Sequence, residues 1–307
     1  MSLICVGSMA YDAIETPFGK RDRIVGGSAV YVAYAASNFI KPINLISIIG
    51  NDFAAEEIRQ LEARGADMEG VEHVPDKKSF FWSGKYHLDM NSRDTLITDL
   101  NVLGDFNPRV PDHFQGSEFM MLGNLSPAVQ ISVIEQMKVR PKMIAMDTMN
   151  FWMESAMDDL KRVLGMVDIL LVNDSEARQL SGEFSILKAA RKIMKMGPQY
   201  LVIKKGEHGA LLFHESQVFF APALPLEDVF DPTGAGDTFA GGFMGHLAKS
   251  RDISFENMKT AIIVGSALAS FCVEKFGPER LKEVSHADIE DRIQQFIQLV
   301  NFDFSLV

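Results

Sequence analysis

The chain of 307 residues is poor in several features that would assign it to a particular class of protein. It has only two cysteines, Cys5 and Cys272, and each lies in an apolar run. Two buried free thiols suit a reducing compartment such as the cytoplasm. No apolar stretch approaches the length of a membrane span, and the N-terminal apolar run is too short, and lacks the basic leader, for a signal peptide. We therefore expect a soluble cytoplasmic protein.

Positive charge is also scarce, because 30 Lys and Arg stand against 41 Asp and Glu and give a formal net charge of −11. This balance argues against nucleic acid or an anionic membrane as a main partner. The seven histidines form no pattern typical of a zinc site. The chain has neither the G-x-S-x-G elbow of serine hydrolases nor the G-x-x-x-x-G-K-[ST] loop of Walker-type proteins.

Apolar runs typical of buried strands alternate with helical patterns along most of the sequence. Strands are expected at Leu3–Val6, Ile43–Ile49, Phe119–Leu122, Met143–Met146, Ile169–Val172 and Leu201–Ile203. Helices are expected at Ala29–Phe39, Ala54–Arg64, Ala128–Lys138, Met153–Leu164, Ile186–Met196, Thr238–Lys249, Phe255–Phe271 and Ala287–Val300. This alternation predicts an α/β fold with a parallel sheet covered on both faces. With 47% hydrophobic residues the chain can bury a large core, and we expect a single domain over residues 1–307.

Two stretches, 13–25 and 79–103, break this rhythm. Both show the alternation of antiparallel strands, and the second is rich in aromatic residues around 80–86. That density favours a covering or interface role, and the alternative is an ordinary edge of a sheet packed on the body of the protein.

The run Asp231-Pro-Thr-Gly-Ala-Gly-Asp237 stands at the start of a predicted helix. Gly234 and Gly236 allow a tight turn and a close approach of the backbone to a ligand. The free amides of a first helical turn form an anion site, and Asp237 in that turn could take a proton from an attacking hydroxyl. This combination indicates phosphoryl transfer from a nucleotide to an alcohol, although a capping Asp after a simple glycine turn is the alternative. Phe239 occupies the third glycine position of a dinucleotide fingerprint, which excludes that motif.

The same run closely resembles the C-terminal signature of the ribokinase (PfkB) family of carbohydrate and nucleoside kinases. Gly26-Gly27, followed by small residues up to Ala36, resembles the family's N-terminal signature. Asn173-Asp-Ser-Glu176 resembles its N-x-x-E element, and Lys204-Lys-Gly-Glu-His-Gly209 stands where the family carries a glycine turn near the nucleotide. The four elements occur in the family's order and span most of the chain.

This resemblance implies a ribokinase-like three-layer α/β sandwich with a mostly parallel central sheet and a small β lid. The lid strands would be inserted at about 13–25 and 79–103, cover the substrate and contribute to a homodimer. The resemblance also implies an ATP- and Mg²⁺-dependent kinase. Its catalytic base would be Asp237, and the amides of Gly234, Ala235 and Gly236 would bind the transferring phosphoryl group. Because Asp237 lies at a helix N-terminus, we expect it to be ionised at neutral pH.

Two further elements are implied to bind the nucleotide. Asn173 and Glu176 would organise the phosphates and Mg²⁺, with Glu176 acting through water, and the alternative is a helix-capping box. Lys204, Gly206 and Gly209 would face ATP after a strand end. Lys204 departs from the family pattern, in which this position often carries Thr, and the alternative is a solvated lysine.

A monovalent cation such as K⁺ is implied at Asp231 and Thr233, where the alternative is an Asp that stabilises its own turn. In the family, an Asp at the position of Asp12 binds hydroxyls of the acceptor, a task that suits a carboxylate. Gly26 and Gly27 would bring the backbone close to the acceptor. Further candidates at strand ends are Asn124 and Asn150.

The acceptor is expected to be a small sugar or a ribonucleoside. Flat aromatic surfaces that could stack on a nucleobase, and so favour a nucleoside such as adenosine, are offered by Phe80, Phe81, Trp82, Tyr86 and Trp152. The same residues could form the lid core or a dimer interface, which leaves a plain sugar open. The alternative function is a non-catalytic sugar- or nucleoside-binding protein of the same fold, against which the intact run from Gly234 to Asp237 argues.

Overall fold

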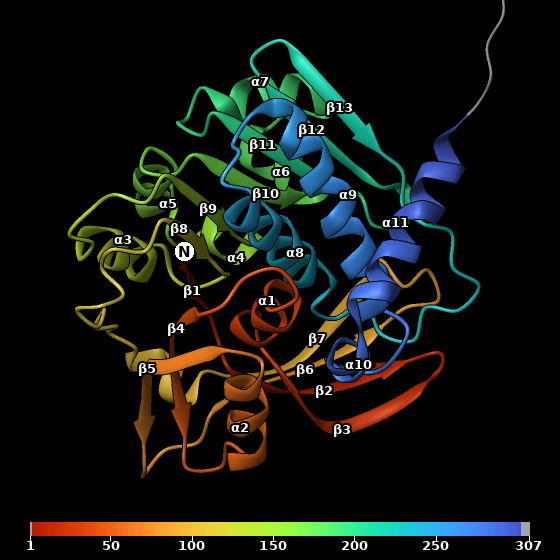
Figure 1. Ribbon diagram of the computed structural model, residues 1–307. Coiled ribbons are helices and arrows are strands. Elements are labelled where there is room, and N and C mark those ends of the chain that lie inside the picture. The colour runs from red at the N-terminus through yellow and green to blue at the C-terminus, as the bar shows by residue number, and fades with distance from the viewer. Residues whose placement is uncertain (1, 302–307) are drawn as a thin grey trace, which may run out of the picture.

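A computed structural model describes residues 2–301 of the chain. Its largest feature is a nine-stranded sheet, here called the large sheet, in the order β13-β12-β11-β10-β9-β8-β1-β4-β5 (Figure 1). The strands are β1 (Leu3–Val6), β4 (Ile43–Gly50), β5 (Ala66–Val74), β8 (Phe119–Leu122), β9 (Met143–Asp147), β10 (Ile169–Asn173), β11 (Tyr200–Lys204), β12 (Ala210–His214) and β13 (Gln217–Ala221). All neighbours pair in parallel except for the antiparallel edge β11-β12-β13.

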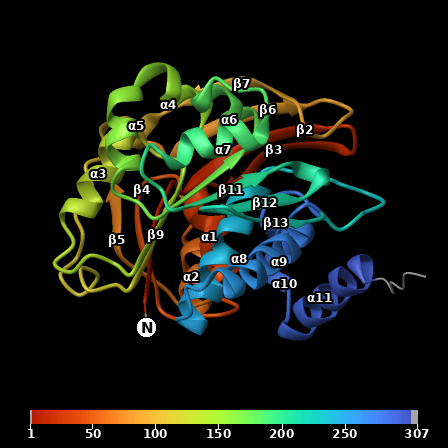
Figure 2. The ribbon, with the colours of Figure 1, turned by 90° about the horizontal axis from the view of Figure 1, so that it is seen from above.

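Helices cover both faces of the large sheet (Figure 2). One face carries α1 (Ser28–Ala36), α2 (Ala55–Ala63), α8 (Ala235–Ser250), α9 (Phe255–Cys272), α10 (Glu279–Glu283) and α11 (His286–Val300). The other carries α3 (Pro127–Glu135), α4 (Asn150–Ser155), α5 (Met157–Leu164), α6 (Asp174–Ser181) and α7 (Ile186–Met194). Alternate residues of β1 point to the two faces of the sheet. Leu3 and Cys5 pack with the helices of the first face, and Ile4 and Val6 pack with those of the second. These buried apolar strands are the reason for helices on both sides.

Most predicted strands and helices are confirmed, but one predicted helix is broken, and three strands and the short helices α6 and α10 were not among the predicted elements. The helix predicted over Met153–Leu164 is two helices, because Ala156 between α4 and α5 leaves the helical region at φ −145° and ψ 39°. The strands β5, β12 and β13 were not predicted. The strands β5 and β13 form the two edges of the sheet and carry exposed residues, so their sequences lack the buried character of the central strands. The strand β12 lies beside the edge and is a run of only five residues.

A second sheet of four strands, here called the small sheet, has the order β3-β2-β6-β7. Its strands are β2 (Ala10–Thr16), β3 (Gly19–Gly26), β6 (Phe80–Tyr86) and β7 (Arg93–Asp99). The expected antiparallel pairing holds within the hairpins β2-β3 and β6-β7, but β2 and β6 run parallel, so the sheet is mixed. Because β2 follows β1 directly, the small sheet extends from the carboxyl edge of the large sheet, where ligands bind in folds of this class. None of the helices in residues 2–301 is long and apolar enough to cross a membrane.

Candidate active site

The anion loop, defined as residues 231–237, leads into the N-terminus of α8. Asp231 is fully buried, and its carboxylate accepts hydrogen bonds from the amides of Thr233 and Gly277, both at 2.9 Å. Gly234 has a φ of 75°, and a Cβ there would lie 2.3 Å from the ring of the buried Tyr31. Only glycine therefore fits at this position.

Three amides of the anion loop, those of Gly234, Ala235 and Gly236, were predicted to be free to bind a phosphoryl group, but one of them is already used within the loop. The Ala235 amide donates to the Pro232 carbonyl at 3.2 Å and so closes the turn. The amides of Gly234 and Gly236 have no acceptor within the described residues 2–301. Free amides at the N-terminus of a helix of 16 residues are donors of the kind that bind an anion.

A buried lysine lies beside this loop. Lys204, at the end of β11, donates from Nζ to Asp147 Oδ2 at 3.0 Å, and both side chains are largely buried, with 17% and 11% exposed. A Cβ on Gly236 would lie 3.0 Å from Lys204 Nζ, so the ammonium borders the anion loop. Burial lowers the pKa of Lys204, but attraction to its carboxylate neighbours raises it by more than that, so the net pKa is raised and the ammonium stays charged. This contact excludes the alternative of a solvated lysine.

Asp147 was not among the predicted site residues. It ends β9, immediately after the apolar run Met143–Met146, and therefore lies at the same edge of the sheet as Asn173 and Lys204. The sequence contained the information needed to predict Asp147, because this polar residue follows an apolar strand just as Asn173 does. Asp147, Glu176 and Asp237, with Lys204 among them, form what we call the carboxylate cluster.

Asp237 lies in the first turn of α8. Burial, and then repulsion from Asp147, raise its pKa to about 7, although Lys204 and Arg93 oppose the shift. The expectation of full ionisation at neutral pH was therefore wrong. The helix N-terminus is outweighed by desolvation and by a second carboxylate. A carboxyl group that titrates near neutrality is well matched to general-base work.

The element Asn173–Glu176 forms the helix cap that was predicted as an alternative. The Glu176 amide donates to Asn173 Oδ1 at 2.8 Å, and the Asn173 amide donates to Glu176 Oε2 at 2.7 Å. Burial, and then repulsion from Asp147, also raise the pKa of Glu176 to about 7. The capping carboxylate thus belongs to the carboxylate cluster as well, and the two roles are compatible.

Asp12, on β2, brings a further carboxylate to the site from the small sheet. A Cβ on Gly26 would lie 1.9 Å from Asp12 Oδ2, so Gly26 provides the room for this carboxylate. Burial, and then repulsion from Asp231 and Asp237, raise the pKa of Asp12 to about 8. Gly27 caps the N-terminus of α1 with a φ of 95°. A Cβ at this position would lie 2.4 Å from the Ser8 carbonyl oxygen, so glycine is required there.

The remaining predicted residues make structural contacts. Asn124 accepts a hydrogen bond from Trp152 Nε1 at 2.9 Å, and Asn150 pairs with Gln179. A Cβ on Gly209 would lie 2.0 Å from the Ala221 carbonyl oxygen, which explains this glycine by packing. A Cβ on Gly206 would lie 2.5 Å from Asn91 Oδ1, so the loop between β6 and β7 touches the turn after β11. Contacts of these four residues with a ligand remain predictions.

The small sheet also contacts the anion loop directly. Thr233 Oγ1 donates to the Tyr86 hydroxyl at 3.1 Å, and the Cys272 thiol donates to the Thr233 carbonyl at 3.6 Å. The hydroxyls of Tyr31 and Thr238, both buried beside the loop, have no partner within residues 2–301. Tyr31 was not predicted for the site, and Tyr86 was predicted only as a ring that could stack on a nucleobase. The contact of Tyr86 with the anion loop has no sign in the sequence.

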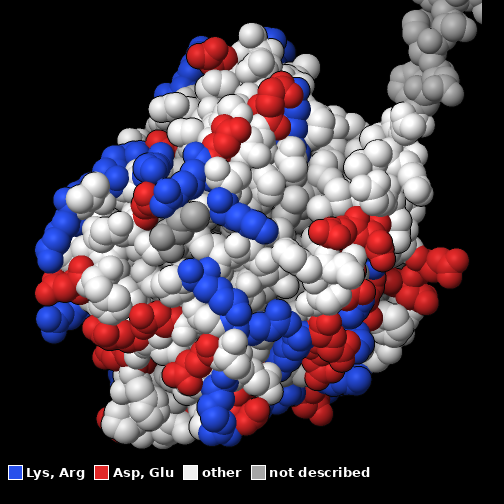
Figure 3. Space-filling view, in the orientation of Figure 1, with Lys and Arg blue, Asp and Glu red and all other residues white. Residues whose placement is uncertain are grey.

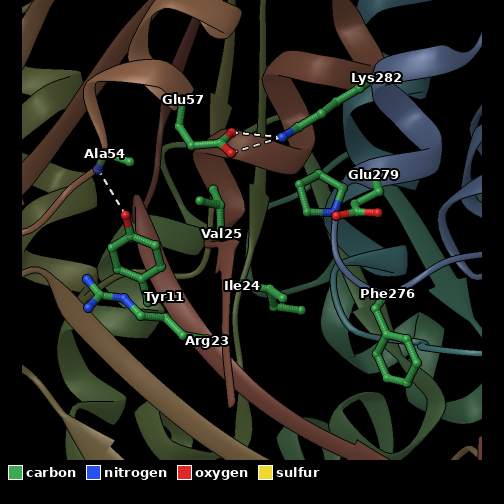
Figure 4. Close-up of a pocket in the computed structure, with 10 residues that line it drawn as sticks. Tyr11, Arg23, Ile24, Val25, Ala54, Glu57, Phe276, Glu279 and Lys282 are labelled. Carbon is green, nitrogen blue, oxygen red and sulfur yellow. Dashed lines mark hydrogen bonds and ion pairs between the residues drawn. The ribbon is translucent and has the colours of Figure 1, made fainter. Parts of the chain in front are cut away.

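Two pockets lie on the other face of the small sheet. One, of about 230 Å³, lies among β2, β3, α2 and α10 and is lined by Tyr11, Arg23 and the ion pair of Lys282 with Glu57 (Figure 4). The second, of about 250 Å³, shares Tyr11 and Arg23. Tyr11 and Asp12 are adjacent on one strand and point to opposite faces, so these pockets are separate from the carboxylate cluster. The surface in Figure 3 shows Lys and Arg interspersed with Asp and Glu rather than one continuous basic face.

Comparison with known proteins agrees with this geometry. Residues 1–283 match the model of the pfkB family of carbohydrate kinases. Cytidine kinase of Thermococcus kodakarensis is 29% identical over 261 residues, which cover 82% of this chain and 91% of that protein. Nucleoside kinase of Methanothermobacter thermautotrophicus is 26% identical over 306 residues, which cover 90% of this chain and 91% of that protein.

Solved structures confirm the predicted ribokinase-like fold. Nucleoside kinase of Methanocaldococcus jannaschii, an archaeal member of the ribokinase family, gives a TM-score of 0.76 at 18% identity and covers 96% of this chain and 98% of its own. Nucleoside kinase of Burkholderia thailandensis in complex with inosine gives 0.74 at 22% identity, with 97% and 99% covered. The chain therefore belongs to the pfkB family of carbohydrate kinases and is a phosphotransferase with an alcohol group as its acceptor.

Proposed function

We propose that this kinase transfers the γ-phosphoryl group of ATP to a hydroxymethyl group of a small sugar or ribonucleoside. The observation that carries the proposal is the meeting of three features at one edge of the large sheet. These are the two free amides of the anion loop, the buried Lys204 ammonium and the Asp237 carboxyl group with its pKa near 7. Together they supply an anion site and a base.

The residues present fit ATP and Mg²⁺. ATP supplies the phosphoryl group, and Mg²⁺ neutralises charge on its phosphates. Free amides and a lysine suit phosphate oxygens. Within residues 2–301 no group of three or more His, Cys, Asp or Glu side chains could hold a metal by itself. Mg²⁺ commonly needs only one or two carboxylates besides phosphate and water, and Asp147 and Glu176 would provide them.

Each residue then has a defined task. Asp12 accepts hydrogen bonds from acceptor hydroxyls and so orients the hydroxymethyl group toward Asp237. Asp237 takes the hydroxyl proton as the acceptor oxygen bonds to the γ-phosphorus and the bond between that phosphorus and the departing ADP oxygen breaks. The amides of Gly234 and Gly236, with Lys204, stabilise the charge on the transferring group.

A ribonucleoside is the favoured acceptor. Trp82 pairs in register with Asp12, so its ring shares the face of the small sheet on which the hydroxyl-binding carboxylate lies. An aromatic ring beside that carboxylate suits the stacking of a nucleobase. Phe81 pairs in register with Tyr11 and therefore lies on the opposite face of the small sheet from Asp12. Trp152 donates a hydrogen bond to Asn124. We therefore assign stacking on the nucleobase to Trp82 rather than to these two rings. The cytidine and nucleoside kinases among the relatives support the same choice.

The test is acceptor-dependent release of ADP from Mg²⁺-ATP across a panel of nucleosides, sugars and sugar phosphates. We expect turnover with one or more ribonucleosides, and phosphorus NMR of the product should show a phosphomonoester on the hydroxymethyl group. Binding of nucleosides without any turnover would contradict the proposal and favour a non-catalytic binding protein. K⁺ dependence at Asp231 and Thr233 and a homodimer through the small sheet stay predictions, to be tested by ion replacement and light scattering.

A further inference from the structure

The strand β13 (Gln217–Ala221) forms one edge of the large sheet (Figure 1). The other edges of the two sheets are β5, β3 and β7, and each of these strands carries several charged side chains. The sequence of β13, Gln-Val-Phe-Phe-Ala, contains neither a charged residue nor a proline. Because charges and prolines on an edge strand discourage pairing with another chain, β13 lacks the protection that the other three edges have.

The main chain of β13 presents unpaired groups along this edge. The Lys205 amide donates to the Gly209 carbonyl at 2.8 Å, which sets the alternation of hydrogen bonds through the register of β11, β12 and β13. Phe219 is therefore hydrogen-bonded to β12, whereas the amides and carbonyls of Val218 and Phe220 point away from the sheet. Within residues 2–301 these outward groups have no hydrogen-bond partner.

The side chains of β13 divide between a covered face and an open one. Phe219 packs against the core beneath α9, and Lys259 Nζ lies 5.9 Å from the centroid of its ring. Val218 and Phe220 point to the other face and are 50% and 54% exposed. Exposed apolar side chains beside unpaired main-chain groups are what an added strand binds, through the backbone for affinity and the side chains for specificity.

We propose that two copies of this chain associate by antiparallel pairing of their β13 strands, which joins the two large sheets across a two-fold axis. A second copy is the partner that fits, because the added strand must be apolar and uncharged, and β13 itself has that composition. A two-fold axis places the same surface on both copies, so no like charges meet within the paired strands. This surface is separate from the small sheet and from the carboxylate cluster.

The outward groups also define the register of this pairing. Centred on Phe219, the pairing places Val218 of each copy opposite Phe220 of the other and uses every outward group of both strands. Centring it on Val218 would require Ser216, which lies in the hairpin turn. Centring it on Phe220 would bring Val218 opposite Pro222, which has no amide to donate. The register centred on Phe219 is therefore the one that the strand favours.

Two substitutions should weaken the association while the protein stays folded. Val218→Pro removes half of the hydrogen bonds between the copies, and an edge strand tolerates proline where the amide points outward. Phe220→Lys adds the kind of charge that the other edges carry. By light scattering over a dilution series we expect each to raise the dissociation constant about 10- to 100-fold. Phe184→Lys makes the same replacement at a phenylalanine that is 92% exposed, and it should match the wild type.

A cross-link tests the register. Cys5 and Cys272 are buried and do not compete with an introduced thiol. In the proposed pairing, Phe219→Cys lies opposite its counterpart, within reach of a disulfide, whereas Gln217→Cys on the same face lies roughly 13 Å from its own. We expect Phe219→Cys to form disulfide-linked dimers at least about tenfold faster than Gln217→Cys under mild oxidation.

Either of two results overturns the inference. One is a wild type whose association neither Val218→Pro nor Phe220→Lys weakens, although both variants keep a cooperative melting transition. That result would leave the strand edge unpaired, and any remaining dimer would belong to another surface such as the small sheet. The other is cross-linking of Phe219→Cys no faster than that of Gln217→Cys.

Discussion

Replacing Lys204 and replacing Asp147 are expected to move the pH dependence of phosphoryl transfer in opposite directions. Asp237 must be ionised to accept the hydroxyl proton, so the rate rises with pH through its pKa. Burial and then Asp147 raise that pKa to about 7, while Lys204 lowers it. Lys204→Met removes an attraction and leaves Asp147 unpaired, which raises the pKa of Asp237. Asp147→Asn removes a repulsion and leaves Lys204 free to act on Asp237, which lowers it.

The size of the shift follows from the charges. At an effective dielectric constant of about 20, two unit charges roughly 8 Å apart interact by about 2 kcal/mol, and one pKa unit corresponds to about 1.4 kcal/mol. Each substitution should therefore move the acid limb by about 1.5 pH units, upward for Lys204→Met and downward for Asp147→Asn. At a fixed pH on the acid side of the limb, one unit corresponds to about a tenfold change in the ionised fraction.

The assay is kcat/KM for the acceptor at saturating Mg²⁺-ATP between about pH 5 and pH 9. The half-buried pair of Asp174 with Arg178 on α6 provides matched controls, because Asp174→Asn and Arg178→Met remove the same charges outside the carboxylate cluster. Neither control should move the limb. A second limb from Asp12, whose pKa is about 8, should keep its position, since the charges that shift it are not those of Asp147 or Lys204. Shifts of both variants in the same direction would refute the electrostatic reasoning.

Three further substitutions are predicted from single contacts. Gly234→Ala places a Cβ 2.3 Å from the Tyr31 ring at φ 75°, so it should cost about 2–4 kcal/mol of stability, whereas the control Gly116→Ala, with open space around it, should leave the melting temperature unchanged. The raised pKa of Asp12 means that ionising this carboxyl group destabilises the folded state, an effect that is absent below the ordinary pKa of 3.8 and grows as the pH rises to about 8. Asp12→Asn should therefore stabilise the protein increasingly between about pH 4 and pH 8, by up to about 5 kcal/mol. Equal gains in melting temperature at both ends of this range would contradict the burial argument for Asp12. Glu176→Gln retains an acceptor for the Asn173 amide, so the free energy of unfolding should change by less than about 1 kcal/mol. The Mg²⁺ concentration needed for activity should rise. An unchanged Mg²⁺ titration would mean that Glu176 only caps the helix.

The central strands and the helix starts could be predicted because they follow local rules. The apolar run ending at Asn173 and the box it forms with Glu176 are visible within one turn of sequence, and both are confirmed. The strands β5, β12 and β13, at or next to the edges of the large sheet, could not be predicted in this way, because their neighbours in the sheet decide their pairing. The role assigned to Asp12 came from the family resemblance, whereas the role of Asp237 was argued both from its place in the first turn of a helix and from the resemblance.

What the sequence could not supply were effects that depend on burial and on contacts between distant segments. The pKa of Asp237 is set by desolvation and by Asp147, which lies 90 positions earlier in the chain. The hydrogen bond between Thr233 and Tyr86 joins the anion loop to a strand of another sheet. Neither relation has a local signature. Both become apparent only when the register of the small sheet is known.

The most direct measurement of the central claim is phosphoryl transfer by Asp237→Asn, compared with the wild type and with Asp174→Asn, another acid in the first turn of a helix. The account predicts a loss of about 1,000-fold or more in kcat for Asp237→Asn only, with ATP affinity by calorimetry within about threefold of the wild type. If Asp237→Asn kept its kcat, Asp237 would not be the base, and the mechanism built on the anion loop would be wrong.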